Sequence, residues 1–588
     1  MVEKMTEEQK EFLDAEGKVV IKACPGSGKT YTVAQKLLSY VDHWKDYHSG
    51  VAVLSFTNVA SNEIYEKAQS IHGSLGKLGY PHFIGTVDSF IDEFIVLRYG
   101  HLHTVGKVRP RIALSDNWKI PYKYWRSECH RNGCVDNIEQ FYYGIDKKLY
   151  KGNEQVNCDR RKAKMLPCQQ YKKMLSDRGI VFQNETALFA YQLLKKYPEV
   201  AAAIAERFPV IIIDEVQDTS INQMAVFELL SDSGMKSMFL VGDPDQSIYE
   251  WRNANPECML QKLDDPNWKT IELTGNFRSS QNICNATSFF SASLRGNGCN
   301  KAIGAWKDET EKPVLLLTRK NSEDEIINYF LGKCCKMGIE VLPKNVAVLT
   351  RGRIYSDTDI AGLWKSKEIE LFAKAAYEWK LGSRKKAYQE ASKASYNMIF
   401  NEDVDEYAMS QKIRECTDEN TWKDYILDIL IDMPDIETEI GEWVKSFSTV
   451  FCSACARYGY EISPDKKLKD IFKIKQSDKK TPNFKQIPLR KYFEKRTEDK
   501  YTRSSIHGVK GESYDAVLIY VKSRTGSTIT PKLLMEGLLD QELMRLAYVA
   551  MTRPRKLLML AMPETKEIKN CGRFPEELWN YEILESSS

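Results

Sequence analysis

The segment Ala23-Cys24-Pro25-Gly26-Ser27-Gly28-Lys29-Thr30 follows the apolar run Val19-Val20-Ile21 and precedes a stretch with helical periodicity. Its glycines let backbone N–H groups curve around phosphate oxygens with no Cβ in the way. The Lys29 ammonium can then reach the β- and γ-phosphates, and the Thr30 hydroxyl can bind Mg²⁺. This strand–loop–helix pattern predicts a phosphate-binding loop, although Ala23 stands where the general pattern has glycine.

Two acids follow a second apolar run, Val210-Ile211-Ile212-Ile213. An acid at the end of a buried strand beside a glycine loop is the expected partner of Mg²⁺. We expect Asp214 to hold the metal and Glu215 to polarise the attacking water. A helix N-terminus would also favour adjacent carboxylates, but the preceding apolar strand argues against that alternative. The two segments together predict hydrolysis of a nucleoside triphosphate.

Short apolar runs of the same kind recur along the chain, at residues 51–54, 238–241, 347–349 and 516–519. Each run is bounded by turn residues and alternates with stretches of helical pattern. Wholly apolar strands in this arrangement are typical of parallel sheets that are buried on both faces. We therefore predict an α/β fold whose ligands bind at the carboxyl ends of the strands.

Composition limits the class of protein. The 588 residues are enough for three to five domains, and a hydrophobic fraction of 43% excludes a disordered chain. No apolar run approaches the ~18 residues that cross a bilayer, so we expect no membrane association. The 14 cysteines are scattered, which favours reduced thiols and a cytoplasmic location. A net charge of +3 leaves a nucleic-acid partner open, because clustering matters more than the sum.

Two stretches interrupt the alternation, at residues ~95–180 and ~376–500, and we interpret both as insertions into α/β domains. From Lys147 to Lys173 there are nine Lys or Arg residues against two acids, and from Lys466 to Lys500 there are thirteen against five. A charge run by itself usually marks a solvated face. Two such runs beside nucleotide motifs favour a nucleic-acid surface.

The residues around the acids resemble a known family. The motifs that carry the resemblance occur in the family's order and extend from residue 9 to residue 553. Besides Gln9 and the glycine loop at residues 23–30, they are Gly85-Thr86-Val87-Asp88-Ser89-Phe90, Asp214-Glu215-Val216-Gln217-Asp218-Thr219, Gly242-Asp243-Pro244-Asp245-Gln246-Ser247-Ile248-Tyr249-Glu250-Trp251-Arg252, Asn276-Phe277-Arg278-Ser279, Ile506-His507-Gly508-Val509-Lys510-Gly511 and Arg545-Leu546-Ala547-Tyr548-Val549-Ala550-Met551-Thr552-Arg553. The set strongly resembles superfamily 1A helicases of the UvrD/Rep/PcrA type.

The resemblance implies two RecA-like parallel-sheet domains of the P-loop NTPase class, each with a mainly helical inserted accessory domain. The expected boundaries are residues 1–95 with 181–280 for the ATP-binding domain, 96–180 for its insertion, 281–375 with 501–588 for the second RecA-like domain, and 376–500 for its insertion. It also implies that single-stranded DNA crosses both RecA-like domains and that movement runs from 3′ to 5′.

The family's ATP-site roles carry over where positions match. Gln9 fits the residue that recognises the adenine edge, and Phe277 stands in place of a tyrosine that stacks on adenine. Gln246 fits the γ-phosphate sensor. Arg278 and Arg553 fit the two arginines that neutralise charge developing on the γ-phosphoryl group. Closure of the two domains around ATP, and its release after hydrolysis, would drive movement along DNA.

The resemblance also assigns DNA contacts, whose aromatic rings can stack on bases at ~1–3 kcal/mol each while hydroxyls and amides contact phosphates. Phe90 and Trp251 taken alone would more often be core residues, and only the matched motifs favour contact with DNA. The complete set is Phe56, Thr57, Asn58, Thr86, Phe90, Tyr249, Trp251, Arg252 and His507.

Some positions depart from the family. Glu250 and Asn253 stand where glycine is usual, and Glu512 stands beside the place of a glutamate that contacts ribose, so we assign it no ribose role. Cysteines could bind a metal at Cys129, Cys134, Cys158 and Cys168, or as the pair Cys452 and Cys455. Their spacings match no known pattern, so scattered reduced thiols are the better interpretation.

Three functional hypotheses remain at this point. The first is an ATP-dependent 3′–5′ DNA helicase that acts on single strands and single-strand/duplex junctions, in repair or in phage defence. The short accessory region is similar to that of compact members such as the helicase subunit of Gabija-type defence systems, and favours a nuclease partner. The second is a DNA-sensing ATPase subunit that gates a partner without unwinding. The third, an RNA helicase, fits the motifs less well.

Overall fold

The computed structural model describes residues 5–72, 78–113, 141–151, 154–155, 172, 174–250, 253–319, 321–350, 364, 366–402, 409, 412–413, 415–473, 484–494, 501–521, 529–565, 567–568 and 571–585. The chain divides into two compact units. Unit 1 comprises Met1–Ile112, Cys134–Ile354 and Lys500–Ser588, and unit 2 comprises Ala113–Gly133 and Tyr355–Asp499. Among the described residues, no helix has the length and apolar character needed to cross a bilayer.

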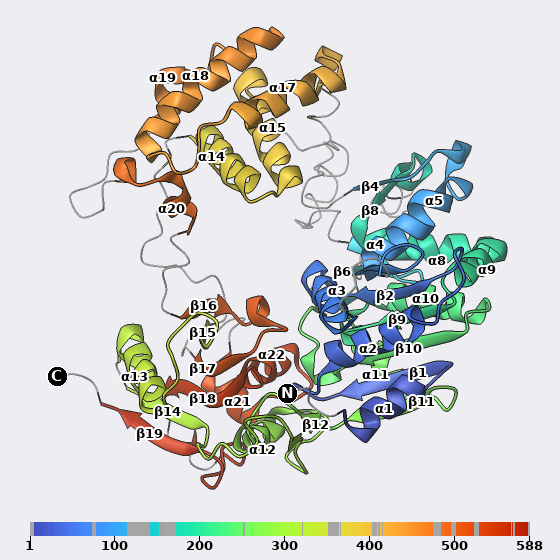
Figure 1. Ribbon diagram of the computed structural model, residues 1–588, viewed down its shortest axis with the longest axis vertical. Helices are drawn as coiled ribbons and strands as arrows, with labels where there is room; N and C mark the ends of the chain where they lie inside the picture. Colours follow the sequence, from blue (N-terminus) through green and yellow to red (C-terminus); the bar gives the residue numbers. More distant parts are fainter. Residues whose placement is uncertain are drawn as a thin grey trace, which may run out of the picture. The chain divides into compact units, whose positions relative to one another are not determined.

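Unit 1 contains two six-stranded sheets, and both are wholly parallel (Figure 1). The first sheet has the strand order β11 (Lys269–Leu273), β1 (Lys18–Ala23), β10 (Ser237–Gly242), β9 (Val210–Ile213), β2 (Val51–Ser55) and β3 (Phe83–Thr86). The second sheet has the order β16 (Thr502–Ser505), β15 (Val346–Thr350), β17 (Tyr514–Tyr520), β18 (Pro554–Pro563), β14 (Val314–Thr318) and β19 (Asn580–Leu584).

Alternate residues of the first sheet enter separate cores on its two faces. Val19 and Ile21 of β1 pack in a cluster with side chains of α1 (Glu7–Asp14), α2 (Lys29–Val41) and α3 (Asn58–His72). Val20 packs in the opposite cluster, with side chains of α4 (Val87–Ile91), α8 (Thr186–Lys196), α9 (Pro198–Arg207) and α10 (Ile221–Asp232). This double burial explains why the strands are wholly apolar.

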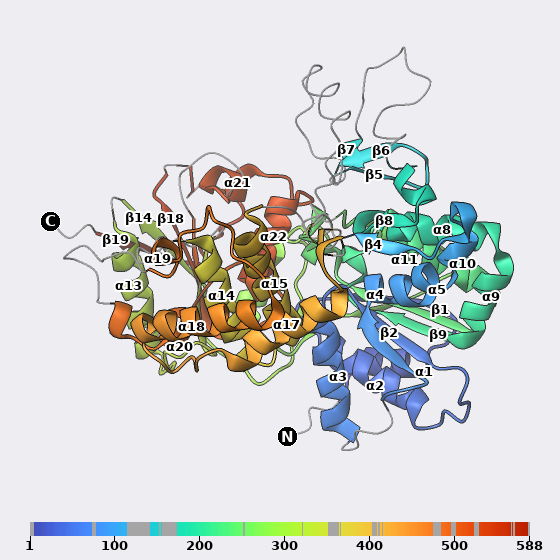
Figure 2. The same ribbon diagram turned by 90° about the horizontal axis from the view of Figure 1, so that it is seen from above.

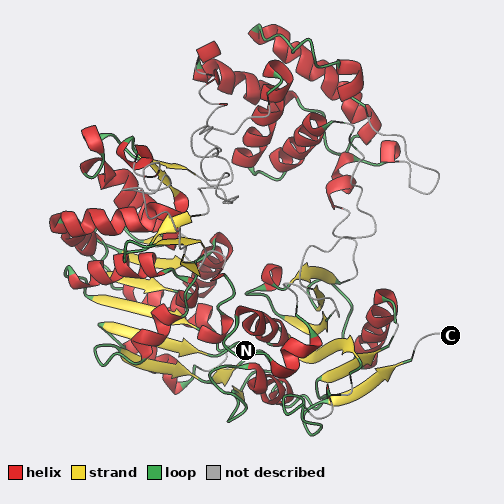
Figure 3. Cartoon of the chain, turned by 180° about the vertical axis from the view of Figure 1, so that it is seen from behind, coloured by secondary structure: helices red, strands yellow, loops and turns green. Residues whose placement is uncertain are grey.

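The second sheet is built in the same way (Figure 3). Leu316 and Val348 face a core that includes α13 (Glu323–Lys336), whereas Leu317 and Leu349 face α12 (Gln281–Thr287), α21 (Pro531–Glu536) and α22 (Glu542–Met551). The strands predicted at residues 347–349 and 516–519 are confirmed as parts of β15 and β17. The α/β class with parallel sheets is therefore confirmed.

Short strands form smaller sheets apart from these two. The pairs are β4 (Arg111–Ala113) with β8 (Ile180–Phe182) and β12 (Gly275–Asn276) with β13 (Lys301–Ala302). An antiparallel sheet joins β5 (Phe141–Tyr143), β6 (Leu149–Lys151) and β7 (Glu154–Gln155). The side chain of Asn222 on α10 anchors its first turn, because it accepts from Ile145 N at 3.1 Å and donates to Tyr143 O at 2.8 Å.

The described part of unit 2 is mainly helical (Figure 2). Its helices are α14 (Lys367–Lys380), α15 (Arg384–Phe400), α17 (Glu419–Asp432), α18 (Ile440–Tyr458), α19 (Leu468–Ile471) and α20 (Leu489–Glu494). They enclose their own aromatic core, in which the Trp443 and Phe447 rings of α18 stack with centroids 5.0 Å apart. Unit 2 thus has an apolar core of its own.

Candidate nucleotide and nucleic-acid site

The predicted phosphate-binding loop connects β1 to α2, as the sequence indicates. Gly26 and Gly28 have φ angles of 72° and 77°, in the left-handed region that favours glycine. A Cβ on Gly26 would lie 2.6 Å from Asn276 Oδ1 and 2.7 Å from Arg278 Cβ, so no larger residue fits there. Thr30 is the second residue of α2, beside Lys29 at the helix start.

The two acids follow β9 at the carboxyl edge of the first sheet. Asp214 is 2% exposed, and its backbone N donates to Leu54 O at 2.8 Å. Glu215 has a φ of 54°, a strained conformation for a residue with a side chain, of the kind that clusters at functional sites. Its Oε1 atom lies 3.5 Å from Lys29 Nζ. The structure thus brings the predicted lysine and acids together.

The pKa values of the two neighbouring carboxyls are shifted in opposite directions. Burial, followed by the charge of Glu215, raises the pKa of Asp214 to about 7. Burial alone would also raise the pKa of Glu215, but the cations of Lys29 and Lys510 lower that pKa to about 2. Burial likewise raises the pKa of nearby Asp243, to about 6. Buried carboxyls of this kind, together with the Thr30 hydroxyl, are oxygen donors that suit a hard divalent cation such as Mg²⁺.

Arginines from the region of the second sheet reach the same site. Arg553 is 2% exposed, and its Nη2 donates to Gln246 Oε1 at 2.8 Å. Gln246 in turn donates from Nε2 to Asp243 Oδ2 at 2.5 Å. Arg278 donates from Nη1 to the carbonyl oxygen of Thr552 at 3.1 Å. Burial, followed by the charge of Arg553, lowers the pKa of Arg278, so an anion bound beside Arg278 would stabilise its charged form.

Gln9 and Phe277 both lie beside the loop at Gly28. A Cβ built on Gly28 would lie 3.3 Å from Gln9 Nε2 and 3.8 Å from Phe277 Cδ2. Gln9 donates to Ser27 O at 3.2 Å and to Thr32 Oγ1 at 3.1 Å, while Phe277 N donates to Gly26 O at 2.8 Å. This arrangement suits an aromatic base held against the loop, and the roles of these residues stay predictions.

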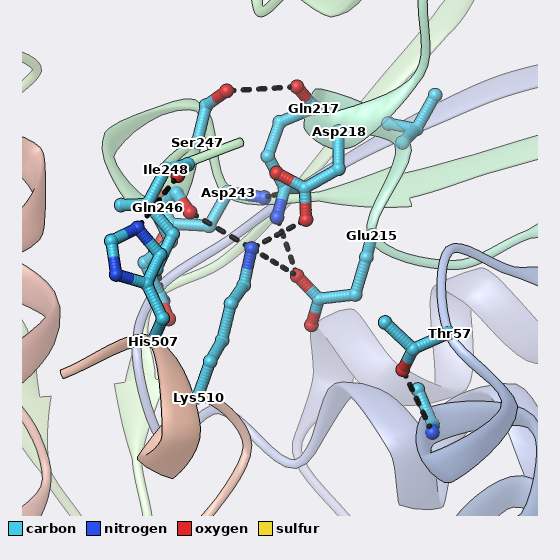
Figure 4. Close-up of polar contacts among 12 residues, drawn as sticks. Thr57, Glu215, Gln217, Asp218, Asp243, Gln246, Ser247, Ile248, His507 and Lys510 are labelled. Atoms are coloured by element: carbon cyan, nitrogen blue, oxygen red, sulfur yellow. Dashed lines mark hydrogen bonds and ion pairs between the residues drawn. The ribbon is translucent and has the colours of Figure 1, made fainter. Parts of the chain in front are cut away.

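Lys510, to which the sequence analysis gave no role, lies at the centre of this site (Figure 4). Its ammonium pairs with the carboxylate of Asp218, which is 1% exposed, and donates to Gln246 O at 3.0 Å. It also lies 3.9 Å from Glu215 Oε2. Burial raises the pKa of Asp218 to about 6, although Lys510 opposes the shift. A lysine within a matched motif was the available signal, but its partner is 292 positions away.

Three of the predicted DNA contacts form an aromatic column. The rings of Phe56 and Tyr249 stack with centroids 5.0 Å apart, and the His507 ring lies 5.9 Å from that of Tyr249. The Nε2 atom of His507 lies 3.2 Å from Ile248 O, to which it donates when protonated (Figure 4). Lys510 Nζ lies 4.8 Å from the Tyr249 ring centroid. The column therefore shares Lys510 with the nucleotide site.

The remaining predicted DNA contacts lie at the starts of helices, outside the described residues or, for Phe90, in the core. Thr57 Oγ1 accepts from Ala60 N at 3.2 Å at the start of α3, where Asn58 is the first residue, and Thr86 caps α4 through Ser89. Trp251 and Arg252 lie outside the described residues.

Phe90 requires a correction. This residue is 0% exposed and packs among other rings in the core, with centroids 5.2 Å from Phe208 and 5.8 Å from Phe227. A nucleic-acid base cannot stack on a ring that is enclosed on all sides by protein. Phe90 is therefore a core residue, and the prediction that it contacts DNA is wrong.

Of the six cysteines considered as metal ligands, the structure describes two. Cys129, Cys134, Cys158 and Cys168 lie outside the described residues. Cys452 and Cys455 both lie on α18, where the Cys455 Sγ atom is 3.3 Å from the hydroxyl of Tyr425. Within the described ranges, no group of three or more His, Cys, Asp or Glu side chains is arranged to hold a metal ion.

Part of the chain matches a known family model and several relatives. Residues 5–267 match the family model described as UvrD/REP helicase N-terminal domain. The Gabija protein GajB of Bacillus cereus (strain VD045) is 27% identical over 318 residues, which cover 53% of this chain and 55% of that protein. The putative ATP-dependent DNA helicase YjcD of Bacillus subtilis (strain 168) is 25% identical over 54% of this chain and 42% of its own length.

A third relative is the ATP-dependent DNA helicase PcrA of Staphylococcus aureus (strain Mu50 / ATCC 700699), which is 26% identical over 52% of this chain and 42% of its own length. The chain thus spans about half the length of the curated relatives that it matches.

Proposed function

We propose that this chain is an ATP-dependent DNA helicase that moves 3′ to 5′ on single-stranded DNA, and the match of residues 5–267 to the UvrD/REP helicase N-terminal domain supports this proposal. The observation that carries the proposal is the convergence of Lys29, Glu215, Gln246 and Arg553 beside the loop at Gly26 and Gly28. The names of the relatives PcrA and YjcD describe ATP-dependent DNA helicases, and this supports DNA as the substrate.

The proposed architecture has two RecA-like domains with the boundaries given above, and the two six-stranded parallel sheets support it. In this proposal each sheet is the centre of one RecA-like domain, and ATP binds between them. The lysine and the acids come from the side of the first sheet, whereas Arg553 follows α22 beside the second. Residues 376–500, with their helical described part, would be one accessory domain.

The chemistry follows from the charges at the site. Lys29 and Arg553 would neutralise the charge that builds on the γ-phosphoryl oxygens, and Arg278 would add to this effect. Glu215, whose pKa is held low, would accept a hydrogen bond from the attacking water and orient it. Asp214 and Thr30 would hold Mg²⁺, which supplies compensation for phosphate charge when it is bound. Gln9 and Phe277 would hold the adenine.

The nucleic-acid side of the proposal rests on the column of Phe56, Tyr249 and His507. Rings at this position can stack on successive bases without regard to sequence, as a translocating protein requires. Lys510 lies against Tyr249 and close to Glu215, so the column and the nucleotide site share one cation. Single strands and single-strand/duplex junctions are therefore the proposed substrates.

The proposed cellular role rests on one relative. The similarity to the Gabija protein GajB supports a role in defence against phage with a nuclease partner. A cytoplasmic location is part of the same proposal. DNA repair is the other pathway that fits the same enzymology. Activity assays with and without a candidate nuclease subunit would separate the two roles.

The deciding experiment measures ATPase turnover with and without single-stranded DNA or RNA, and strand separation on 3′-tailed and 5′-tailed duplexes. We expect strong stimulation by DNA and unwinding of the 3′-tailed substrate only. Lys29→Ala should abolish turnover. The control is Lys18→Ala, which removes a lysine of β1 that pairs with Asp232 on α10 and should leave turnover unchanged. DNA stimulation without unwinding would favour a gating ATPase, and full activity of Lys29→Ala would refute the site.

A further inference from the structure

Glu250 stands directly after Tyr249, at a position where the motifs of the resembling helicases usually have glycine. It lies between η7 (Pro244–Gln246) and α11 (Glu257–Leu263), on the loop that follows β10. Its carboxylate forms an ion pair with the guanidinium of Arg545, on α22. The glutamate side chain is 34% exposed, whereas the arginine side chain is only 6% exposed. A charged side chain therefore replaces glycine at a contact between the first-sheet and second-sheet parts of unit 1.

The first turn of α22 holds this loop at more than one point. Arg545 donates from Nε to Ser247 O at 2.6 Å and from Nη1 to Asp540 O. The backbone N of Glu250 donates to Glu542 Oε1 at 3.2 Å. Two side chains of one helical turn thus fix both ends of the segment from Ser247 to Glu250. Tyr249, which stacks on Phe56, lies within that segment.

The same helix is connected to the nucleotide site at its other end. α22 ends at Met551, two residues before Arg553, and Arg553 reaches Gln246 Oε1. On the loop side, the Ser247 hydroxyl donates to Gln217 O at 3.0 Å, and the Gln217 side-chain amide donates to the carboxylate of Glu215 (Figure 4). Arg545 is therefore in direct contact with Ser247, one hydrogen bond from the segment that holds Glu215.

We propose that Glu250 is a positioning residue that couples nucleic-acid binding at Tyr249 to the nucleotide site, through its ion pair with Arg545 on α22. This inference rests on the proposed function and adds to it a chain-specific element of regulation. A base that displaces Tyr249 also moves Glu250, and the pairing transmits that displacement to the helix that precedes Arg553. Contiguous polar contacts of this kind can carry coupling between two sites.

Burial makes the pairing strong enough for this role. The Arg545 side chain is 6% exposed and has lost most of its hydration. Loss of the Glu250 carboxylate would therefore leave a buried cation without a charged partner, which is energetically costly. Arg545 keeps its carbonyl acceptors when Glu250 becomes neutral, which preserves the fold around it. A neutral residue at position 250 should therefore loosen the coupling and leave the nucleotide site assembled.

The test compares Glu250→Gln, Glu250→Asp and the unaltered chain in ATPase assays with increasing single-stranded oligothymidylate. For Glu250→Gln we expect unchanged turnover without DNA, an unchanged half-saturating DNA concentration and a maximal stimulation reduced about fivefold or more. Glu250→Asp, which keeps the charge, should recover part of the stimulation. Loss of DNA affinity at full maximal stimulation would instead make Glu250 a binding residue and overturn the inference.

Glu323→Gln is the matched control. Glu323 on α13 pairs with Arg503 on β16, at exposures of 27% and 25%, but both residues belong to the second-sheet part of unit 1. Its removal should leave stimulation by DNA unchanged. If the unaltered chain shows no stimulation, the proposed function fails and the inference fails with it. If the unaltered chain and Glu250→Gln are stimulated equally, only the inference is overturned.

Discussion

The guanidinium of Arg553 donates a hydrogen bond from Nη2 to Gln246 Oε1 at 2.8 Å, although 307 positions separate the two residues. Gln246 belongs to the loop after the central strand β10 of the first sheet, and Arg553 lies between α22 and β18 of the second. Both side chains are almost completely buried. An arginine held in this way is already oriented before any phosphate arrives, which lowers the cost of stabilising a transition state.

Replacement of Arg553 tests this arrangement. Arg553→Ala should reduce the turnover number of ATP hydrolysis by about 100-fold or more, while ATP binding remains measurable, because the lost charge acts mainly on the transition state. The measurements are steady-state ATPase and equilibrium binding of a fluorescent ATP analogue. Arg319→Ala, which removes an exposed arginine paired with Glu564, is the control. Equal losses of binding and turnover would show that Arg553 acts on the ground state.

Replacement of Lys510 should affect stability as well as activity. Lys510→Gln leaves the buried carboxylate of Asp218 without its cation, and loss of one partner of a buried pair costs about 3 kcal/mol. We therefore expect a lower midpoint of urea-induced unfolding at pH 8. The double variant Lys510→Gln/Asp218→Asn removes both charges and should recover much of the loss. A double variant as unstable as the single one would contradict this account of the pair.

The aromatic column predicts a specific loss of DNA affinity. Tyr249→Ala removes one stacking surface and should weaken binding of a single-stranded oligonucleotide by about tenfold, whereas Tyr249→Phe keeps the ring and should bind nearly normally. Fluorescence anisotropy measures both. Phe90→Leu provides the contrast, because Phe90 lies in the core: it should lower the unfolding midpoint and leave DNA affinity unchanged. Weaker binding by a stable Phe90→Leu variant would restore the original expectation.

Asp92 predicts a pH dependence of stability. It begins the π-helical turn η1 (Asp92–Val96), and burial raises its pKa to about 7, opposed by a 3.0 Å hydrogen bond that Gln183 donates. Between the unfolded value of 3.8 and about 7, the folded state binds the extra proton, so this group makes stability fall as pH rises through that window. Above it, the folded state carries the full cost of a buried charge.

Asp92→Asn should remove that cost. The variant should be more stable than the unaltered chain at pH 8, by an amount whose upper limit is about 4 kcal/mol, and the two should converge near pH 4. Urea unfolding at several pH values provides the measurement. A constant difference between the two proteins over the whole range would exclude titration of Asp92 as the cause.

The sequence predicts the central strands well and the outer ones poorly. The runs at residues 51–54, 210–213 and 238–241 are apolar throughout because both faces of the first sheet are covered, and they coincide with β2, β9 and β10. The edge strand β3 has only four residues, all of intermediate exposure, so it carries no continuous apolar signal. The same burial that makes central strands easy to recognise is incomplete at the edge.

For the site, local chemistry could be predicted and long-range pairing could not. The glycine loop and the acids at the end of β9 follow from short motifs, since strand and loop are adjacent in sequence. The roles of Lys510 and Glu250 depend on partners 292 and 295 positions away. Phe90 shows the opposite difficulty, because its motif is shared with DNA-contacting residues but only the packed structure reveals the enclosure of its ring.

The pairing of β15 with β16 has a consequence for how this protein could be altered. The two strands are parallel neighbours, from Ala347 beside Thr502 to Thr350 beside Ser505, yet the chain between them passes through most of unit 2. Parallel neighbours need a crossover of about a dozen residues or more, and here the helical unit serves as that connection. We therefore expect that a crossover of different length or sequence between Thr350 and Thr502 would leave the order of the strands unchanged. A simple deletion that joins the strands directly would leave no path back to the start of β16.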